Sequence, residues 1–400
     1  MTIFEKYQDD LTLGKKAVLG LQHMFTMFGA TILVPLITGL DISVALFMAG
    51  ICTIAFHLIT QGKIPIFLGS SFAFIPPILA VSATYGMPYA LGGIVIAGSV
   101  YLLFALLVGI FGSEKVMSFF PPVVTGPIII IIGLVLAPIA IGNSSENWLL
   151  ASIAFVVVAG VAVFTKGFIK VLPVLCGLVV GYIVAVITGH VDFTPVKEAA
   201  WFGLPAFTLA KFNINAILLV APVAIATVVE HIGDVVVLKS TCNKDFFKSP
   251  GLHRTLLGDG IASCVSAMFG GPANTTYSEN TGVLVLTRVY NPVVMRIAAC
   301  FAILLSIVPK LNAVIATIPT PVIGGISIIL FGMIASVGAR TLVEKQVDFT
   351  QSRNLIIAAV VLVVGLGGSS VFSFSSIAIA AVVGIVLNKL LPEKIGKKAE

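Results

Sequence analysis

Four acidic side chains lie inside long apolar stretches of this 400-residue chain, where a charge is costly. They are Glu230 and Asp234 in one stretch, Asp259 in the next, and Glu279 in the one after that. A charged residue at the centre of a bilayer costs about 3 kcal/mol or more, so these groups should face the protein interior or a water-filled cavity. No lysine or arginine lies in the central part of these stretches. The acids are therefore candidates for binding a solute or a coupling ion, with structural pairing as the alternative.

Proton binding is the first chemistry that such acids suggest. Glu230 and Asp234 are four residues apart, which places both on one face of a helix. Carboxylates gathered without cations can bind and release protons, so we expect proton coupling through these two and through Glu279 and Asp259. The same groups could instead coordinate sodium. His23 in the first apolar stretch is a further candidate, with a buried structural histidine as the alternative. No metal-ligand spacing is evident, so we expect neither a metal site nor a cofactor.

Two polar runs interrupt apolar stretches and predict broken helices. Residues 274–282 read Asn-Thr-Thr-Tyr-Ser-Glu-Asn-Thr-Gly and follow a Gly-Gly-Pro sequence, which disfavours a continuous helix. Residues 69–74 read Gly-Ser-Ser-Phe-Ala-Phe. Broken backbone is tolerated at membrane depth only inside protein or beside a cavity, so we expect a small-ligand site here, reached by the N-termini of half-helices.

The residue types at these breaks indicate what kind of ligand they would suit. Phe72, with Ser71 beside it, could stack on a flat ligand, although most of the 27 phenylalanines pack in the core or against lipid. Carboxylates, small hydroxyls and open backbone groups suit a neutral solute rich in N–H donors. They would repel an anion.

Composition fixes the broad class of the protein. The chain is 58% hydrophobic and 10% charged, with a mean hydropathy of +1.13. No water-soluble domain has this balance, so we expect an all-α polytopic membrane protein without a nucleic-acid partner. The polar start of the chain contains no short apolar region with a cleavage site, so we expect no removed signal peptide.

Apolar runs of helix-spanning length predict fourteen spans. Their approximate positions are 17–40, 42–60, 64–80, 88–111, 122–141, 148–165, 168–189, 213–238, 252–269, 273–288, 291–315, 319–339, 354–371 and 374–391. With a cytoplasmic N-terminus, this layout puts 20 of the 23 lysines and arginines inside and 3 outside. The positive-inside rule therefore favours fourteen spans with both termini cytoplasmic.

The two halves of the chain resemble each other. At an offset of 199 residues, the matches are Pro122 with Pro321, Gly126 with Gly325 and Gly133 with Gly332. A second match near that offset pairs 69–73 with 270–274, which makes the third and tenth spans equivalent. Seven spans per half is an odd number, so the second half must enter the membrane the other way round. The sequence thus predicts two inverted 7-span repeats, with short extended segments breaking spans 3 and 10.

Four motifs together resemble the nucleobase–ascorbate transporter family, and within it the uracil permease branch. The family signature Gln/Glu-Asn-x-Gly-x4-Thr-Arg/Lys/Gly is matched by Glu279, Asn280, Gly282, Thr287 and Arg288. The other three are the Gln-His pair at 22–23, the Glu-His-Ile-Gly at 230–233, and the run at 69–74. The resemblance covers nearly the whole chain.

The resemblance implies proton symport of a nucleobase by a core domain that moves against a gate domain, in a homodimer of the plasma membrane. It implies that Glu230 and Glu279 hydrogen-bond the base, that Phe72 packs on it, and that the backbone near Ser278 contacts it. The implied division is an N-terminal tail at 1–16, core domain at 17–111 and 213–315, gate domain at 112–212 and 316–391, and a cytoplasmic C-terminus at 392–400.

Asp234 departs from the uracil branch, where a histidine is usual four residues after the glutamate. It resembles the purine branch, whereas a glutamate at 279 resembles the uracil branch. We therefore expect a proton-coupled uracil importer. The alternatives are a purine symporter for xanthine, guanine or urate, a sulfate-type anion carrier of the same architecture, and, from another class, an intramembrane enzyme or channel.

Overall fold

The computed structural model describes residues 11–367 and 375–392, except for the side chains of Ser278 and Glu279. In the first half the elements are α2 (Leu13–Thr38), α3 (Ile42–Ile59), β1 (Leu68–Ser70), η1 (Phe72–Phe74), α4 (Ile75–Tyr85), α5 (Met87–Phe111), α6 (Ser113–Met117), α7 (Pro122–Val135), α8 (Ala137–Ser145), α9 (Trp148–Phe164), η2 (Gly167–Val171), α10 (Pro173–Ile187) and α11 (Thr194–Glu198).

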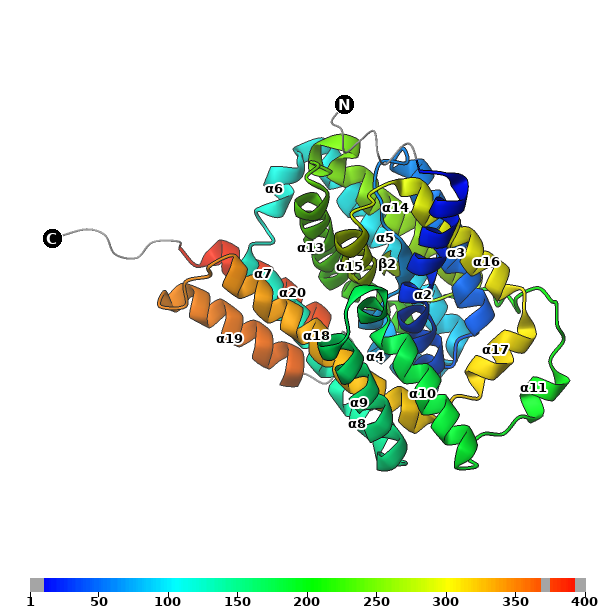
Figure 1. Ribbon diagram of the computed structural model, residues 1–400. Helices are drawn as coiled ribbons and strands as arrows, with labels where there is room; N and C mark the ends of the chain where they lie inside the picture. The colour runs from blue at the N-terminus through cyan, green and yellow to red at the C-terminus, as the bar shows by residue number, and fades with distance from the viewer. Residues whose placement is uncertain (1–10, 368–374, 393–400) are drawn as a thin grey trace.

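In the second half they are α12 (Ile214–Val220), η3 (Ala221–Val223), α13 (Ala224–Cys242), η4 (Phe247–Gly251), α14 (Leu252–Met268), β2 (Asn274–Thr276), α15 (Ser278–Thr287), α16 (Pro292–Ser306), α17 (Pro309–Ala316), α18 (Thr320–Glu344), α19 (Ser352–Gly367) and α20 (Ser376–Leu390). The protein is thus almost entirely helical, as its composition predicts (Figure 1).

The apolar helices have the length that a bilayer requires. Within the described residues, six are long and apolar enough to span: Leu13–Thr38, Ile42–Ile59, Met87–Phe111, Pro122–Ser145, Ile214–Cys242 and Thr320–Glu344. Five shorter apolar helices have 10–17 residues. Each of the fourteen predicted spans overlaps at least one helix of the structure, but the number of membrane crossings stays a prediction.

The eleventh predicted span differs from the expectation of one apolar run. Its two helices, α16 and α17, are bent by 83° at a short break. Pro309 begins α17, and a proline has no N–H with which to continue the ladder of α16. The residue before a proline also avoids the helical conformation, so α16 ends at Ser306.

The third and tenth spans are broken by short extended segments, and this prediction is confirmed. β1 and β2 pair antiparallel, with Leu68 opposite Thr276, Gly69 opposite Thr275 and Ser70 opposite Asn274. A strand this short cannot satisfy its backbone groups in hydrocarbon alone. Pairing the two breaks with each other satisfies those groups inside the protein.

In an inverted repeat, each contact between two helices should have a counterpart in which each helix is replaced by its equivalent in the other half. The helix packing follows this rule. The fourth span, α5, packs on the ninth, α14, and the second, α3, packs on the eleventh, α16. Exchanging the halves converts one of these pairs into the other. The pairs α9 with α10 and α19 with α20 are related in the same way, and α7 packs on its own counterpart α18.

Close backbone contacts hold α7 against α18. A Cβ on Gly126 would lie 2.5 Å from the Leu342 side chain, and one on Gly133 would lie 2.4 Å from the Phe331 carbonyl oxygen. Figure 1 shows α18, α19 and α20 together on one side of the molecule and α3, α16 and α17 on the other. Phe331 lies on α18, and the helices that pack most extensively on α18 differ from those that pack most extensively on α3 and α14.

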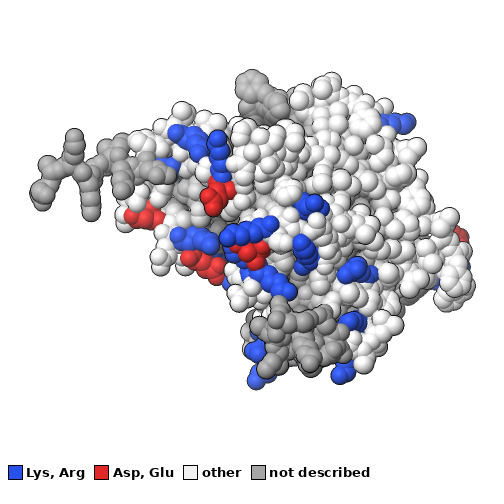
Figure 2. Space-filling model, turned by 90° about the horizontal axis from the view of Figure 1, so that it is seen from above, with Lys and Arg blue, Asp and Glu red and all other residues white. Residues whose placement is uncertain are grey.

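One face of the molecule is strongly basic. Figure 2 shows lysine and arginine side chains gathered on the face at the top of Figure 1, with fewer acidic side chains among them. Such a face is typical of the cytoplasmic side of a membrane protein.

Candidate functional site

The paired breaks form a closed backbone unit rather than two loose loops. The ladder continues beyond the strands, because the Ser71 N–H donates to the Ala273 carbonyl (2.9 Å) and the Tyr277 N–H donates to the Phe67 carbonyl (3.1 Å). One residue beyond each end of the pair, η1 and α15 begin. The two short helices therefore start from a common, hydrogen-bonded base.

Side chains from the neighbouring helices hold this unit in place. The Tyr277 hydroxyl donates to the Ser70 carbonyl (3.0 Å), and the Ser70 hydroxyl donates to the Thr31 carbonyl of α2 (3.0 Å). On the other side, the Ser263 hydroxyl of α14 donates to the Asn274 carbonyl (2.8 Å). Hydrogen bonds between buried polar groups such as these favour a single arrangement of the pair.

Gly69 leaves the space that Tyr277 needs. A Cβ on Gly69 would lie 2.4 Å from the Tyr277 ring and 2.9 Å from the Thr31 hydroxyl. We expect Gly69→Ala to destabilise the protein by about 1–3 kcal/mol through overpacking and to lower substrate binding, because the strands would separate. Thermal unfolding in detergent and binding titrations measure the two effects.

Gly160→Ala is the matched control for this substitution, because a Cβ on Gly160 in α9 meets nothing within 4 Å. A Gly69→Ala protein as stable as Gly160→Ala would contradict the close packing of Gly69 against Tyr277.

The two acids of α13 share one face, as their spacing predicts. Glu230 and Asp234 are both half-buried, whereas His231 between them is fully buried on another face. The Thr276 hydroxyl of β2 donates to the Asp234 carboxylate at 2.7 Å. This bond joins the acidic face of α13 directly to the strand pair.

Thr276 has a testable role in positioning Asp234. Thr276→Val keeps the shape of the side chain but removes the donor, and a hydrogen bond to a charged group is worth about 1.5–3 kcal/mol. We expect uptake to fall roughly tenfold or more in Thr276→Val and to stay near normal in Thr276→Ser. Equal uptake by the two variants would show that this hydrogen bond is not needed.

Asp259 of α14 is placed against His231 rather than against the acidic face. The His231 Nδ1 and the Asp259 Oδ2 are 2.9 Å apart, and neither side chain is exposed. On the other side of the ring, the His231 Nε2 lies 2.9 Å from the Thr255 hydroxyl, which itself donates to the Leu252 carbonyl (2.9 Å). The Tyr101 ring packs edge-on against the imidazole.

These contacts join α13 to α14 through buried polar side chains. The His231 Nδ1 and the Asp259 Oδ2 approach each other without the geometry of a hydrogen bond, and neither Asp259 oxygen has a hydrogen-bond partner among the described residues. The Asp259 carboxyl therefore depends on the nearby imidazole as its polar neighbour.

Phe72 lies where the broken third span meets α18. Its ring is 6.0 Å from the Phe331 ring in an edge-on arrangement, and it remains 8% exposed. The neighbouring Ser71 hydroxyl is buried and makes no hydrogen bond to any described residue. An aromatic edge and a buried polar group thus lie side by side at the start of η1.

The signature residues lie along α15. The Asn280 side chain is buried, and its amide makes no hydrogen bond within the described part of the chain. Thr287 donates to the Val283 carbonyl (2.8 Å), and Arg288 ends the helix with a positive φ of 55°. Gly282 is exposed.

Three predicted site residues remain to be placed: Ser278, Glu279 and His23. The side chains of Ser278 and Glu279 lie outside the described residues, so their predicted roles stay predictions. His23 on α2 is 1% exposed, and its Nδ1 has no hydrogen-bond partner among the described residues. No sequence motif indicates the contact of His231 with Asp259, because the two residues are 28 positions apart and lie on different helices.

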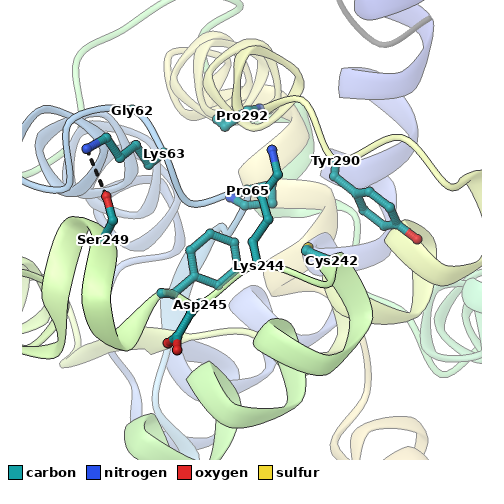
Figure 3. Close-up of a pocket in the computed structure, with 10 residues that line it drawn as sticks. Gly62, Lys63, Pro65, Cys242, Lys244, Asp245, Ser249, Tyr290 and Pro292 are labelled. Atoms are coloured by element: carbon teal, nitrogen blue, oxygen red, sulfur yellow. Dashed lines mark hydrogen bonds between the residues drawn. The ribbon is translucent and has the colours of Figure 1, made fainter. Parts of the chain in front are cut away.

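A cavity of ≈420 Å³ opens at the end of α13, away from these residues (Figure 3). Lys63 donates to the Ser249 hydroxyl (3.0 Å) on one side of it, and Tyr290 lies on the other. Asp245 also lines the cavity, and a hydrogen bond from Lys239 lowers the pKa of its carboxyl. None of the predicted site residues whose side chains the structure describes lines this cavity, so it is separate from the described part of the candidate site.

Comparison with known proteins decides the family. The model of a family described as a permease family matches residues 14–374. The chain belongs to this permease family. Membership identifies it as a multi-pass membrane transporter and not an enzyme.

Relatives match over nearly their whole lengths. A probable uracil permease of Haemophilus influenzae is 46% identical over 392 residues, covering 95% of each chain. The uracil permease of Bacillus caldolyticus is 46% identical over 405 residues, covering 96% of this chain and 94% of that one. The uracil permease of Escherichia coli K12 is 39% identical over 404 residues, with the same two coverages.

Solved structures show the same fold at low identity. The transmembrane domain of the cyanobacterial bicarbonate transporter BicA has a TM-score of 0.67 and 16% identity, covering 92% of this chain and 96% of that one. The murine anion transporter Slc26a9 in an inward-facing state has a TM-score of 0.69 and 11% identity, covering 95% and 68%. These likenesses confirm the predicted class of transporter fold.

Proposed function

We propose that this transporter imports uracil together with protons across the plasma membrane. The observation that carries the proposal is the bond between Thr276 and Asp234, which joins an acidic helix face to the paired breaks of two helices. Several relatives at 39–47% identity are named uracil permease or probable uracil permease, which supports uracil as the base.

The proposed substrate site lies between the strand pair, α13 and α18. Glu230 and Glu279 accept hydrogen bonds from the N–H groups of the base, and the backbone at Ser278 and the hydroxyl of Ser71 bind its carbonyl oxygens. Phe72 packs on the ring. The buried Ser71 hydroxyl, which makes no hydrogen bond to a described residue, supports this assignment, as does the position of Phe72 against a second aromatic ring.

Proton coupling is assigned to the acids around this site. Asp234 accepts a hydrogen bond from the strand pair, Glu230 lies one turn away on the same helix face, and both are half-buried. Both are therefore assigned to exchange a proton with a bound solute or with water. Asp259, fully buried against His231, is assigned as a second proton-binding group, and His23 is retained as a further candidate. Sodium in place of the proton is the alternative.

Alternating access is assigned to motion between the predicted core (17–111 and 213–315) and gate (112–212 and 316–391). The extensive packing within each group supports this division: α5 on α14 in one, α7 on α18 in the other. On α15, Val285 and Leu286 are 58% and 44% exposed along a helix that ends at Arg288. We assign this open side to the cytoplasm, together with both termini, and the functional unit to a homodimer.

Uptake by proteoliposomes tests the proposal. Labelled uracil should accumulate when the outside is acidic, collapse with a protonophore, and be indifferent to a sodium gradient. Accumulation driven by sodium alone would overturn proton coupling. Unlabelled bases decide the substrate: xanthine or guanine competing better than uracil would favour the purine alternative that Asp234 keeps open.

Anion transport is the second candidate, because both structural relatives named above are described as bicarbonate or anion transporters. That likeness shows the fold alone. The carboxylates of Glu230 and Asp234 beside the strand pair would repel an anion, so we expect no bicarbonate or sulfate uptake.

A further inference from the structure

A groove of ≈430 Å³ lies between α5 and α20, and no described residue of the candidate site lines it. Its walls are Phe104, Leu107 and Phe111 of α5, Phe119 and Phe120 before α7, and Ile385 of α20, together with Val116 of α6. Lys115 is the one charged residue among the described residues that line it. The groove is therefore an apolar slot with a cation at its edge.

A second lysine lies over one of the aromatic rings that line the groove. Lys115 Nζ is 5.2 Å from the centre of the Phe111 ring, and Lys389 Nζ is 4.1 Å from that of Phe119. Lys389 also donates to the Ser118 hydroxyl (3.2 Å). Both lysines are exposed, and neither takes part in an ion pair within the described residues, although Glu114 is adjacent to Lys115.

We propose that this groove binds an anionic phospholipid, with one acyl chain along the aromatic walls and the phosphate group between Lys115 and Lys389. The exposed rings of Phe111 (53%) and Phe119 (40%) face the surroundings of a membrane-spanning helix, so lipid is the apolar molecule available to cover them. Lipid tails differ little from one another in apolar character, so the walls alone select no lipid. Selectivity comes from the two ammonium groups and the Ser118 hydroxyl.

The position of the groove gives the lipid a role. Its walls combine α5 with α20 and with the segment before α7, which belong to the two groups of helices that the proposed function sets in relative motion. A lipid seated there contacts both groups. Anionic lipid would thus stabilise one relative position of core and gate; this step, unlike the binding itself, rests on the proposed function.

Native mass spectrometry of the purified protein tests the binding without any transport. Phosphatidylglycerol and phosphatidylethanolamine are titrated separately, and we expect phosphatidylglycerol to bind the more tightly. Each lysine near an anionic surface contributes about 1 kcal/mol, so Lys115→Gln/Lys389→Gln should lower phosphatidylglycerol affinity about 30-fold and leave phosphatidylethanolamine affinity unchanged. Ile385→Trp, which fills the slot, should weaken both lipids.

The matched control is Lys166→Gln/Lys170→Gln, which removes two lysines near η2, outside the groove. This control should bind phosphatidylglycerol as the unaltered protein does. Equal losses in the two double variants, or equal binding of the two lipids by the unaltered protein, would overturn the proposal. Lost selectivity with intact uracil uptake would refute only the coupling to transport.

Discussion

Glu230→Ala is expected to abolish uracil uptake while the protein still accumulates in the membrane. The carboxylate on the acidic face of α13 is the proposed acceptor for an N–H group of the base, and a charge-assisted hydrogen bond is worth about 1.5–3 kcal/mol. The loss of this bond alone should lower kcat/KM roughly 10- to 100-fold, and the loss of a proposed proton-binding group removes accumulation as well. Initial rates of labelled uracil uptake, normalised to protein measured by size-exclusion chromatography, give this value.

The control for Glu230 is Glu198→Ala, which removes an exposed carboxylate at the end of the short helix α11. Glu279→Ala should behave as Glu230→Ala does, and near-normal uptake by either would refute the proposed site. Glu230→Gln separates binding from coupling: it keeps the shape of the side chain but cannot release a proton. Uracil exchange without accumulation is the expected phenotype of this variant.

Breaking the buried pair of His231 and Asp259 should cost the protein about 3–5 kcal/mol of stability. In Asp259→Leu the buried imidazole loses its acidic neighbour, and in His231→Leu the Asp259 carboxyl is left fully buried without the imidazole beside it. We expect each single variant to unfold at a clearly lower concentration of sodium dodecyl sulfate. The double variant His231→Leu/Asp259→Leu should recover much of the loss, because no unpaired polar group remains.

Glu198→Leu, at the exposed end of the short helix α11, is the control and should change stability by no more than about 0.5 kcal/mol. If the two single losses simply add in the double variant, the two side chains do not stabilise each other. Asp259→Asn then distinguishes stability from transport: preserved stability with lost accumulation would identify Asp259 as part of the proton route.

Local sequence signals predicted much of the architecture. Apolar runs located the helices, and the polar residues after Gly270-Gly271-Pro272 and around Ser71 located both breaks. The four-residue spacing of Glu230 and Asp234 predicted their common face. These features depend on the period and composition of a single segment, which is why they can be read without a structure.

Contacts between segments that are distant in the sequence were harder to predict. The partnership of His231 with Asp259 depends on how α13 lies against α14, and no motif within either helix indicates it. The bond between Thr276 and Asp234 likewise depends on the placement of β2 beside α13. The bend before Pro309 has a local signal, because a proline inside an apolar run ends a helix. The length of the run nevertheless favoured a single unbroken span.

The pairing of β1 with β2 also bears on how the protein is made. Ser70 and Asn274 face each other across 204 positions of the chain. At a synthesis rate of about 5–20 residues per second, the first strand waits roughly 10–40 seconds for its partner. During that interval its backbone donors and acceptors are inside the lipid without the ladder that later satisfies them. Biogenesis of this transporter therefore needs something to shelter the first break, whether water drawn into the bilayer or an insertion factor that retains the early helices until the second break emerges.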